Sequence, residues 1–226
     1  MSQLSIPEVR IGKVRQSFQI FWALLSALAS AAVCAGIYAL NPRYFFIDDK
    51  ISSIAPVYLD IGRMLHAGLF PWMSLGTFAA SNYVLEYQYG IFNPLCLFTM
   101  WLTPMFDNQA LVHALIAGIY VFFTSLSAYL FGRALRIAPP LSALLAFVVG
   151  TNPAHMVWNL AAWLPGAPGL CFLVLALAAA VFYVRKPAAL SVIGVSASVY
   201  LLVLAALFLF IPAAIFLARR AKAVEA

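Results

Sequence analysis

Residues 18–40 form an apolar run without a charged side chain, and this run constrains the fold more than any other feature. A helix that crosses the hydrocarbon core of a bilayer needs about 20 consecutive apolar residues. Soluble domains are close to half apolar and a quarter charged, whereas this chain is 65% hydrophobic and 9% charged, with a mean hydropathy of +0.99. The sequence therefore predicts an integral membrane protein of the all-α class, a polytopic bundle of membrane helices.

The other apolar runs predict about five spanning helices, with six as the alternative. The predicted spans are residues 18–40, 109–132, 141 to about 150, 168–184 and 188–217. The last run holds 30 residues, and one tilted helix is favoured over two short ones because it contains no obvious turn. Since no length is left for a soluble domain, residues 1–226 are predicted to form a single membrane domain.

Basic residues cluster at the ends of the apolar runs. The clusters are Arg10 to Arg15, Arg133 with Arg136, Arg185 with Lys186, and Arg219 to Lys222. Because Lys and Arg are enriched in cytoplasmic loops, we expect a multi-pass membrane protein with a cytoplasmic N-terminus. Residues 41–107 then form an extracytoplasmic loop. The net charge of +6 is dispersed rather than gathered in a stripe, which excludes nucleic acid as the expected partner.

The acidic residues gather in that one loop. Apart from Glu8 and Glu225, they all lie between Asp48 and Asp107. A wet loop accounts for their location, but it accounts less well for the adjacency of Asp48 and Asp49. Like charges repel, and carboxylates beside a membrane helix are costly to desolvate. This pair is therefore the principal candidate for a functional site.

The loop also carries two segments that are predicted to lie against the membrane. In residues 52–68 the apolar side chains recur at helical spacing, which predicts a short interfacial helix, with Ser53 as its cap and Gly68 as its end. Residues 83–104 are rich in aromatics and contain two prolines, which favours a dipping or lateral helix over a full span. Asp107 is predicted to cap the following helix or to lie in its first turn.

A first helix, an acidic motif and a long external loop with juxtamembrane helices together resemble the GT-C membrane glycosyltransferases. The segments "LHAGLFPWMSLGTF" and "EYQYGIFNPLCLF" resemble the YfhO family of bacterial membrane proteins, whose members have a comparable "G-x-x-P-x-W-S" turn followed by "Y-x-x-x-x-P-x-x-L". The later "AYLFGRALRIAPPLSALLAF" and "WNLAAWLPGAPGL" extend the similarity over about residues 40–185. The chain looks like a short or truncated member with a GT-C-like N-terminal half.

This resemblance implies a protein of the bacterial cytoplasmic (inner) membrane. It also implies an inverting transfer of a sugar from a polyprenyl-phosphate donor to an extracytoplasmic glycan or lipid acceptor of the cell envelope. Such a reaction needs a carboxylate that takes the proton of the acceptor hydroxyl, and the resemblance favours Asp49 or Asp48 in this role. It also needs positive charge beside the departing phosphate. The candidates for binding the substrate are Arg43, Lys50, Arg63, Glu86 and His155.

Other roles for the acidic pair stay open. Asp49 can form a structural ion pair with Lys50 or Arg43. A divalent-cation site made by Asp48, Asp49 and Glu86 is also possible but less favoured, since no further ligand spacing is present. At the level of function, the alternatives are a non-catalytic partner or scaffold for another membrane protein and a transporter of a lipid-linked substrate. The transporter is less favoured because the predicted spans carry few ionisable side chains.

Overall fold

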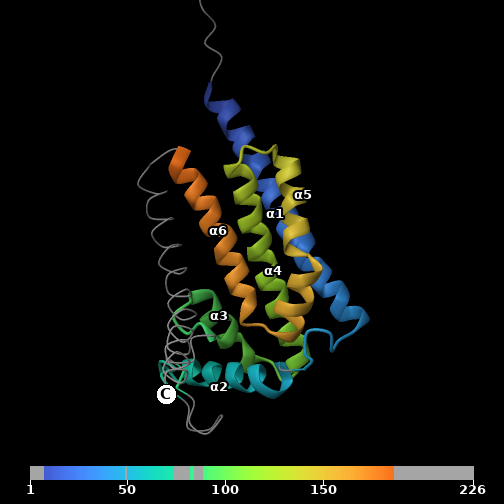
Figure 1. Cartoon of the computed structure of the whole chain (residues 1–226), viewed down its shortest axis with the longest axis vertical. Coiled ribbons are helices and arrows are strands. Elements are labelled where there is room, and N and C mark those ends of the chain that lie inside the picture. Colours follow the sequence, from blue (N-terminus) through green and yellow to red (C-terminus); the bar gives the residue numbers. More distant parts are fainter. Residues whose placement is uncertain (1–7, 49, 74–81, 84–88, 186–226) are drawn as a thin grey trace, which may run out of the picture.

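The computed structural model describes residues 8–48, 50–73, 82–83 and 89–185, and within these ranges the chain is helical and contains no strand. Four helices lie side by side, and each runs opposite to the one before it (Figure 1). They are α1 (Glu8–Leu40), α4 (Gln109–Ala134), α5 (Pro139–Gly150) and α6 (Gly166–Arg185). Helix α4 is central, because it contacts each of the other three. The predicted all-α bundle is confirmed.

Two helices in the described part of the chain are long and apolar enough to cross a membrane: Ser17–Leu40 within α1, and the whole of α4. A third span is obtained if α5 and the π-helix η4 (His155–Ala162) count as one helix with a bend of 50°. These spans support a membrane protein. The predicted span at residues 188–217 lies outside the described residues, and the total of about five stays a prediction.

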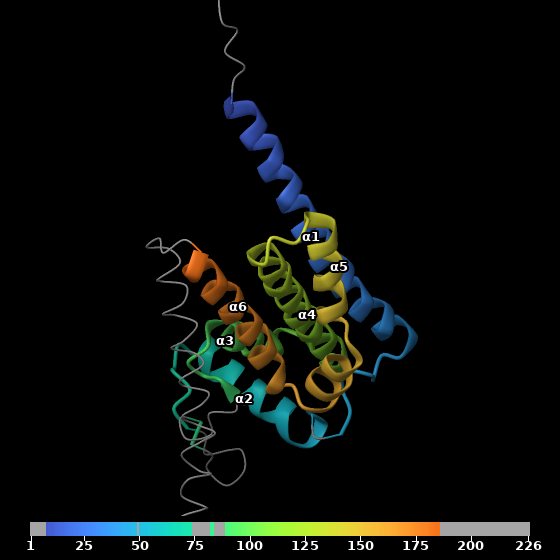
Figure 2. The same ribbon diagram turned by 45° about the horizontal axis from the view of Figure 1, so that its top comes forward.

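Helix α2 (Ala55–His66) lies across the end of the bundle where α1 ends and α4 begins (Figures 1 and 2). One π-helical turn, η1 (Lys50–Ile54), leads into it. Its buried side chains include Val57, Tyr58 and Ile61, which recur every three or four residues and so share one face. The predicted amphipathic helix over residues 52–68 is therefore confirmed.

The ends of the helices differ in part from the prediction. Ser53 does not cap α2, because η1 continues directly into the helix and leaves no free N-terminus to cap. Gly68 does end it, with a positive φ of 73° that glycine adopts without strain. The cap of α4 is Asn108 rather than Asp107, since the Asn108 Oδ1 accepts the Leu111 N–H at 3.1 Å.

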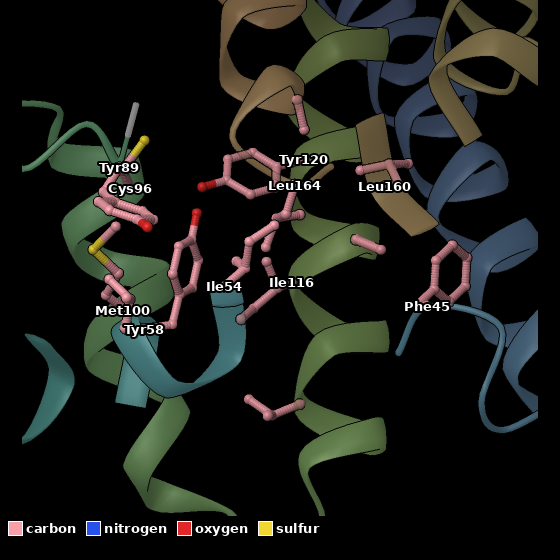
Figure 3. Close-up of a cluster of buried hydrophobic side chains, with 14 of the residues drawn as sticks. Phe45, Ile54, Tyr58, Tyr89, Cys96, Met100, Ile116, Tyr120, Leu160 and Leu164 are labelled. Atoms are coloured by element: carbon pink, nitrogen blue, oxygen red, sulfur yellow. The ribbon is translucent and has the colours of Figure 1, made fainter. Parts of the chain in front are cut away.

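The main core lies where α2, α3 (Pro94–Leu102), α4 and η4 meet (Figure 3). Its fully buried side chains include Ile54, Met100, Ile116, Leu160 and Leu164. A second, smaller cluster joins α1, α4 and α5 toward the other end of the bundle and consists largely of alanines. Small residues let membrane helices approach closely, so the two ends of the bundle are packed in different ways.

Within the described residues, the helix ends that carry basic clusters fall at one end of the bundle, while Lys186 and the cluster Arg219 to Lys222 lie outside the described residues. Helix α1 begins there, α4 ends there beside Arg133 and Arg136, and α6 ends there at Arg185 (Figure 1). The α1–α2 connection and helix α2 lie at the opposite end. The fold therefore separates the positively charged helix ends from the acidic loop by the length of the spans.

Candidate functional site

The connection between α1 and α2 carries the acidic pair and is built from successive tight turns. The Tyr44 N–H donates to the Asn41 carbonyl at 3.0 Å, and the Phe46 N–H donates to the Arg43 carbonyl at 2.9 Å. Past the acidic residues, the Ile51 N–H donates to the Asp48 carbonyl at 3.0 Å. These bonds turn the chain back from the end of α1 toward α2, and they hold the acidic segment at the end of the bundle.

Asp48 is exposed and has a φ of 52°, a left-handed conformation that disfavours most L-residues. Asp and Asn tolerate it best because their short polar side chains can bond locally. The chain is fixed on both sides of this residue, since Phe45 and Lys50 are fully buried. The carboxylate is thus directed away from the core on a backbone that its buried neighbours hold in place, as is common at functional sites.

Lys50 is the buried anchor of this connection. Its side chain is fully enclosed and its Nζ donates a hydrogen bond to the Leu160 carbonyl of η4. Burial lowers the pKa of the Lys50 ammonium to about 7, because the charged form loses its hydration. The prediction that Lys50 contacts a donor phosphate remains untested, and such a contact would require the side chain to leave Leu160.

The remaining predicted site residues are spread over three elements. Arg43 lies in the α1–α2 connection and Arg63 lies on α2, and both side chains are exposed. His155 begins η4 and is buried. Asp49 and Glu86 lie outside the described residues. The structure therefore brings Asp48, Arg43 and the anchoring Lys50 into one connection, with Arg63 on the helix that follows it.

His155 is held from two sides by asparagines. Its backbone N–H donates to the Asn152 Oδ1 at 2.9 Å, and the Asn159 Nδ2 donates to its Nδ1 at 3.2 Å. Because Nδ1 accepts this hydrogen bond, the neutral ring carries its own hydrogen on Nε2. Within the described residues this Nε2 has no partner. His155 is therefore a buried donor in the bundle rather than a group displayed on the surface.

A layer of polar side chains lies beneath the α1–α2 connection. The His113 Nδ1 donates to the Gln109 carbonyl at 2.9 Å, and its ring lies 5.1 Å from the Phe46 ring, centroid to centroid. The rings of Tyr58 and Tyr120 point toward one another from α2 and α4 (Figure 3). Burial raises the pKa of Tyr58 well above its ordinary value, so this phenol keeps its proton. These groups stabilise the site from within and do not act as its bases.

An apolar groove of about 450 Å³ runs between α1, α4 and α3. It belongs to the half of the bundle near the acidic connection, because its residues come from the last turns of α1 and the first turns of α4. Its small floor residues and two of its aromatic walls are Ala31, Ala35, Ala114, Gly118, Tyr38 and Phe98. At Gly118 an added Cβ would meet no atom within 4 Å. The groove was not predicted, since it depends on which faces of the helices pair.

Metal ligands do not gather in the part of the chain that the structure describes: it holds no group of three or more His, Cys, Asp and Glu side chains. The α1–α2 connection and helix α2 together offer an exposed carboxylate, two exposed guanidinium groups and a neighbouring apolar groove.

No protein-family model, curated protein or solved structure matches this chain. The protein is thus defined by its fold and site alone, as a helical membrane protein with an acidic connection at one end of the bundle.

Proposed function

We propose that this protein is a GT-C-like membrane glycosyltransferase that transfers a sugar from a polyprenyl-phosphate donor to an extracytoplasmic acceptor of the cell envelope, a glycan or a lipid. The observation that carries the proposal is the exposed Asp48, which has a positive φ and lies between the fully buried Phe45 and Lys50 at the end of the spans. The resemblance of residues 40–185 to the YfhO family supplies the reaction class. The proposed orientation puts this end outside the cytoplasmic membrane and the basic helix ends in the cytoplasm.

The proposed chemistry is a single displacement at the anomeric carbon. Asp48 or Asp49 takes the proton of the acceptor hydroxyl, and the acceptor oxygen then forms a bond to the anomeric carbon with inversion. The bond between that carbon and the phosphate oxygen breaks, and polyprenyl phosphate leaves with the electron pair. Arg43 and Arg63 are the exposed cations that are available to stabilise its growing negative charge.

A lipid-linked donor is supported by the apolar groove on the flank of the bundle. Its walls come from α1 and α4, the two candidate spans, so in a bilayer it faces hydrocarbon. A polyprenyl tail in this groove would have its phosphate near the outer end of the spans, which is also the end that carries Asp48. The proposed site therefore combines an apolar subsite for the tail with a solvent-exposed subsite for the sugar.

The proposal is tested by measuring sugar transfer with the full chain, purified in detergent and supplied with a panel of labelled polyprenyl-phosphate sugars. Asp48→Asn, Asp49→Asn and the double variant are compared with Asp107→Asn, which removes an exposed carboxylate at the same end of the bundle. Asn tolerates a positive φ as Asp does. We expect at least one variant of the pair to lose about 100-fold or more in rate, whereas Asp107→Asn keeps full activity.

Transfer that survives in the double variant would contradict the proposed role of the pair. A folded wild type that transfers no sugar from any donor would contradict the enzyme itself and favour a partner subunit. A stable stoichiometric complex, with an activity that survives loss of both carboxylates, would identify such a partner. Uptake of a lipid-linked substrate into vesicles without any transfer would favour the transporter.

A further inference from the structure

The break between α5 and η4 lies between the buried Gly150 and the buried His155, whereas Pro153 and Ala154 within it are exposed. Helix α5 has 12 residues from Pro139 to Gly150 and begins at the basic end. At 1.5 Å per residue it rises about 18 Å, so Gly150 lies near the middle of a hydrocarbon core about 30 Å thick. There the chain turns by 50° into η4. Irregular backbone at this depth is found where neighbouring protein groups or a bound ligand satisfy its polar atoms.

Two serine hydroxyls from other helices converge on this break. A Cβ placed on Gly150 would lie 1.9 Å from the Ser125 Oγ of α4 and 3.4 Å from the Ser30 Oγ of α1. Both serines are fully buried. Neither hydroxyl has a hydrogen-bond partner within the described residues. Gly150 therefore leaves room for two buried hydroxyls that the described residues do not satisfy.

Several other buried or half-buried hydroxyls on the helices of this protein bond to their own helix, although the buried Thr124 Oγ1 of α4, like the two serines, has no partner within the described residues. The Ser26 Oγ donates to the Ala23 carbonyl at 2.9 Å, the Thr99 Oγ1 to the Cys96 carbonyl at 2.9 Å and the Thr151 Oγ1 to the Phe147 carbonyl at 2.7 Å. This is the usual way for Ser and Thr to satisfy a hydroxyl within a helix. In contrast, the hydroxyls of the two serines at Gly150 lie beside the break without such a bond.

The end of α5 also carries carbonyl oxygens that have no partner within the helix. The last four carbonyls of a helix have no partner within it, and the C-terminus carries a partial negative charge. The Phe147 and Val149 carbonyls accept bonds from the Thr151 hydroxyl and the Asn152 amide. The Val148 and Gly150 carbonyls remain without a partner inside α5. The break therefore presents neutral oxygens in a field that favours a cation.

We propose that the α5–η4 break binds a sodium ion through the Ser30 and Ser125 hydroxyls and the carbonyl oxygens at the end of α5. Neutral oxygens without a carboxylate suit a monovalent cation rather than a divalent one. The smaller sodium is favoured over potassium, because Ser125 lies directly against Gly150 and leaves little space. Broken helices near the midplane bind sodium in this way in secondary transporters. The site is separate from the acidic connection and does not depend on the proposed glycosyl transfer.

The test is the thermal unfolding of the full chain in detergent, in sodium chloride, potassium chloride or choline chloride of equal ionic strength. A ligand that binds only the folded state raises the Tm with its concentration, by roughly 5 °C at a hundred times its Kd. We expect sodium to raise the Tm saturably and choline to leave it unchanged. Ser30→Ala and Ser125→Ala should lose this rise. Ser26→Ala should keep it, because that hydroxyl is already bonded on the same helix.

The alanine variants should fold in choline, since each removes only a hydroxyl that lacks a partner. Retention of radioactive sodium by the wild type, and its loss in the two variants, would support the site directly. Equal unfolding temperatures in the three salts would show that a water molecule or no ligand occupies the break, and this would overturn the proposal. So would a rise with potassium as large as that with sodium, or a rise that survives in both variants.

Discussion

Lys50 places an ammonium group in the core, and its buried state has a consequence for stability. Its pKa in the folded protein is lowered to about 7, against about 10.4 for an exposed lysine. Between these two values the unfolded chain binds more protons, so the free energy of unfolding should rise with pH from about 7 to about 10. Lys50→Met should remove most of this slope and stabilise the protein at pH 6 by about 1–3 kcal/mol. Denaturant unfolding in micelles at several pH values measures both effects.

The matched control for Lys50→Met is Arg63→Met, which removes an exposed cation from the neighbouring helix. It should leave the pH dependence of the free energy of unfolding unchanged. A Lys50→Met variant that is less stable than the wild type at pH 6 would mean that the charged bond to Leu160 outweighs the loss of hydration. The same variant also separates two roles of Lys50. A group that anchors the connection should change stability, whereas a phosphate ligand should mainly change the binding of the donor.

Functional residues could be predicted from the sequence only where a type of side chain is unusual for its position. Two adjacent carboxylates beside an apolar run are such a case, and Asp48 is indeed exposed at the end of the bundle. The burial of Lys50 could not be predicted, because its partner is a backbone carbonyl that any residue at position 160 would supply. The sequence did not single out Ser30 and Ser125 either, because an isolated serine in an apolar helix is common.

At the level of helices, the contact between α2 and the segment that includes α3 depends on a glycine. A Cβ on Gly62 would lie 2.4 Å from the Met100 carbonyl oxygen and 2.6 Å from the Cδ of Pro104. Gly62→Ala should therefore push the two segments apart and destabilise the protein by about 1–3 kcal/mol. Gly118→Ala is the matched control, because no atom lies within 4 Å of its added Cβ and alanine favours helix by up to about 1 kcal/mol. Thermal unfolding in detergent compares them, and an equally stable Gly62→Ala variant would contradict the close contact.

Helix positions could be predicted well because the apolar runs are long and the breakers between them are strong. The predicted helix at 109–132 corresponds to α4, and the prolines at 139 and 140 do begin α5. Single capping residues were less predictable. A cap depends on the geometry of one turn, so Asn108 rather than the neighbouring Asp107 binds the free N–H of α4. The sequence predicted only that this span ends at about residue 150, and it did not predict the 50° bend that follows Gly150.

In the predicted orientation of the whole molecule, the acidic connection lies on the extracytoplasmic side of the membrane and the basic helix ends lie on the cytoplasmic side. The native thiols at Cys34, Cys96 and Cys171 are buried and should resist a membrane-impermeant maleimide in the folded protein. Asp107→Cys and Ala138→Cys each place a thiol at an exposed position, at opposite ends of α4. In intact cells the maleimide should label Asp107→Cys, and it should label Ala138→Cys only after permeabilisation. The reverse pattern would contradict the proposed orientation.

The arrangement of the whole bundle could be predicted least. The basic clusters indicated which ends of the helices lie together, and in the structure the start of α1 and the ends of α4 and α6 share one end of the bundle. The sequence did not predict that α4 would be the central helix, in contact with α1, α5 and α6. Neighbouring faces of apolar helices look alike in sequence, and their pairing is decided by small differences in shape. The apolar groove and the convergence of serines on Gly150 both follow from that pairing, so neither could be foreseen.

Two hydrogen bonds in the bundle join residues that are far apart in the sequence, so they can form only after the later residue has been synthesised. Lys50 bonds to a carbonyl 110 positions later, and Tyr129 bonds to the Gln19 carbonyl across the same separation. The outer layer built on α2 is synthesised before α4 and η4, yet its core residues pack against both. Until α4 and η4 have been synthesised, the apolar face of this layer therefore lacks the helices that cover it in the folded protein. A nascent chain that ends before Leu160 has no acceptor for the Lys50 ammonium, so the layer can reach its final packing only after η4 is made.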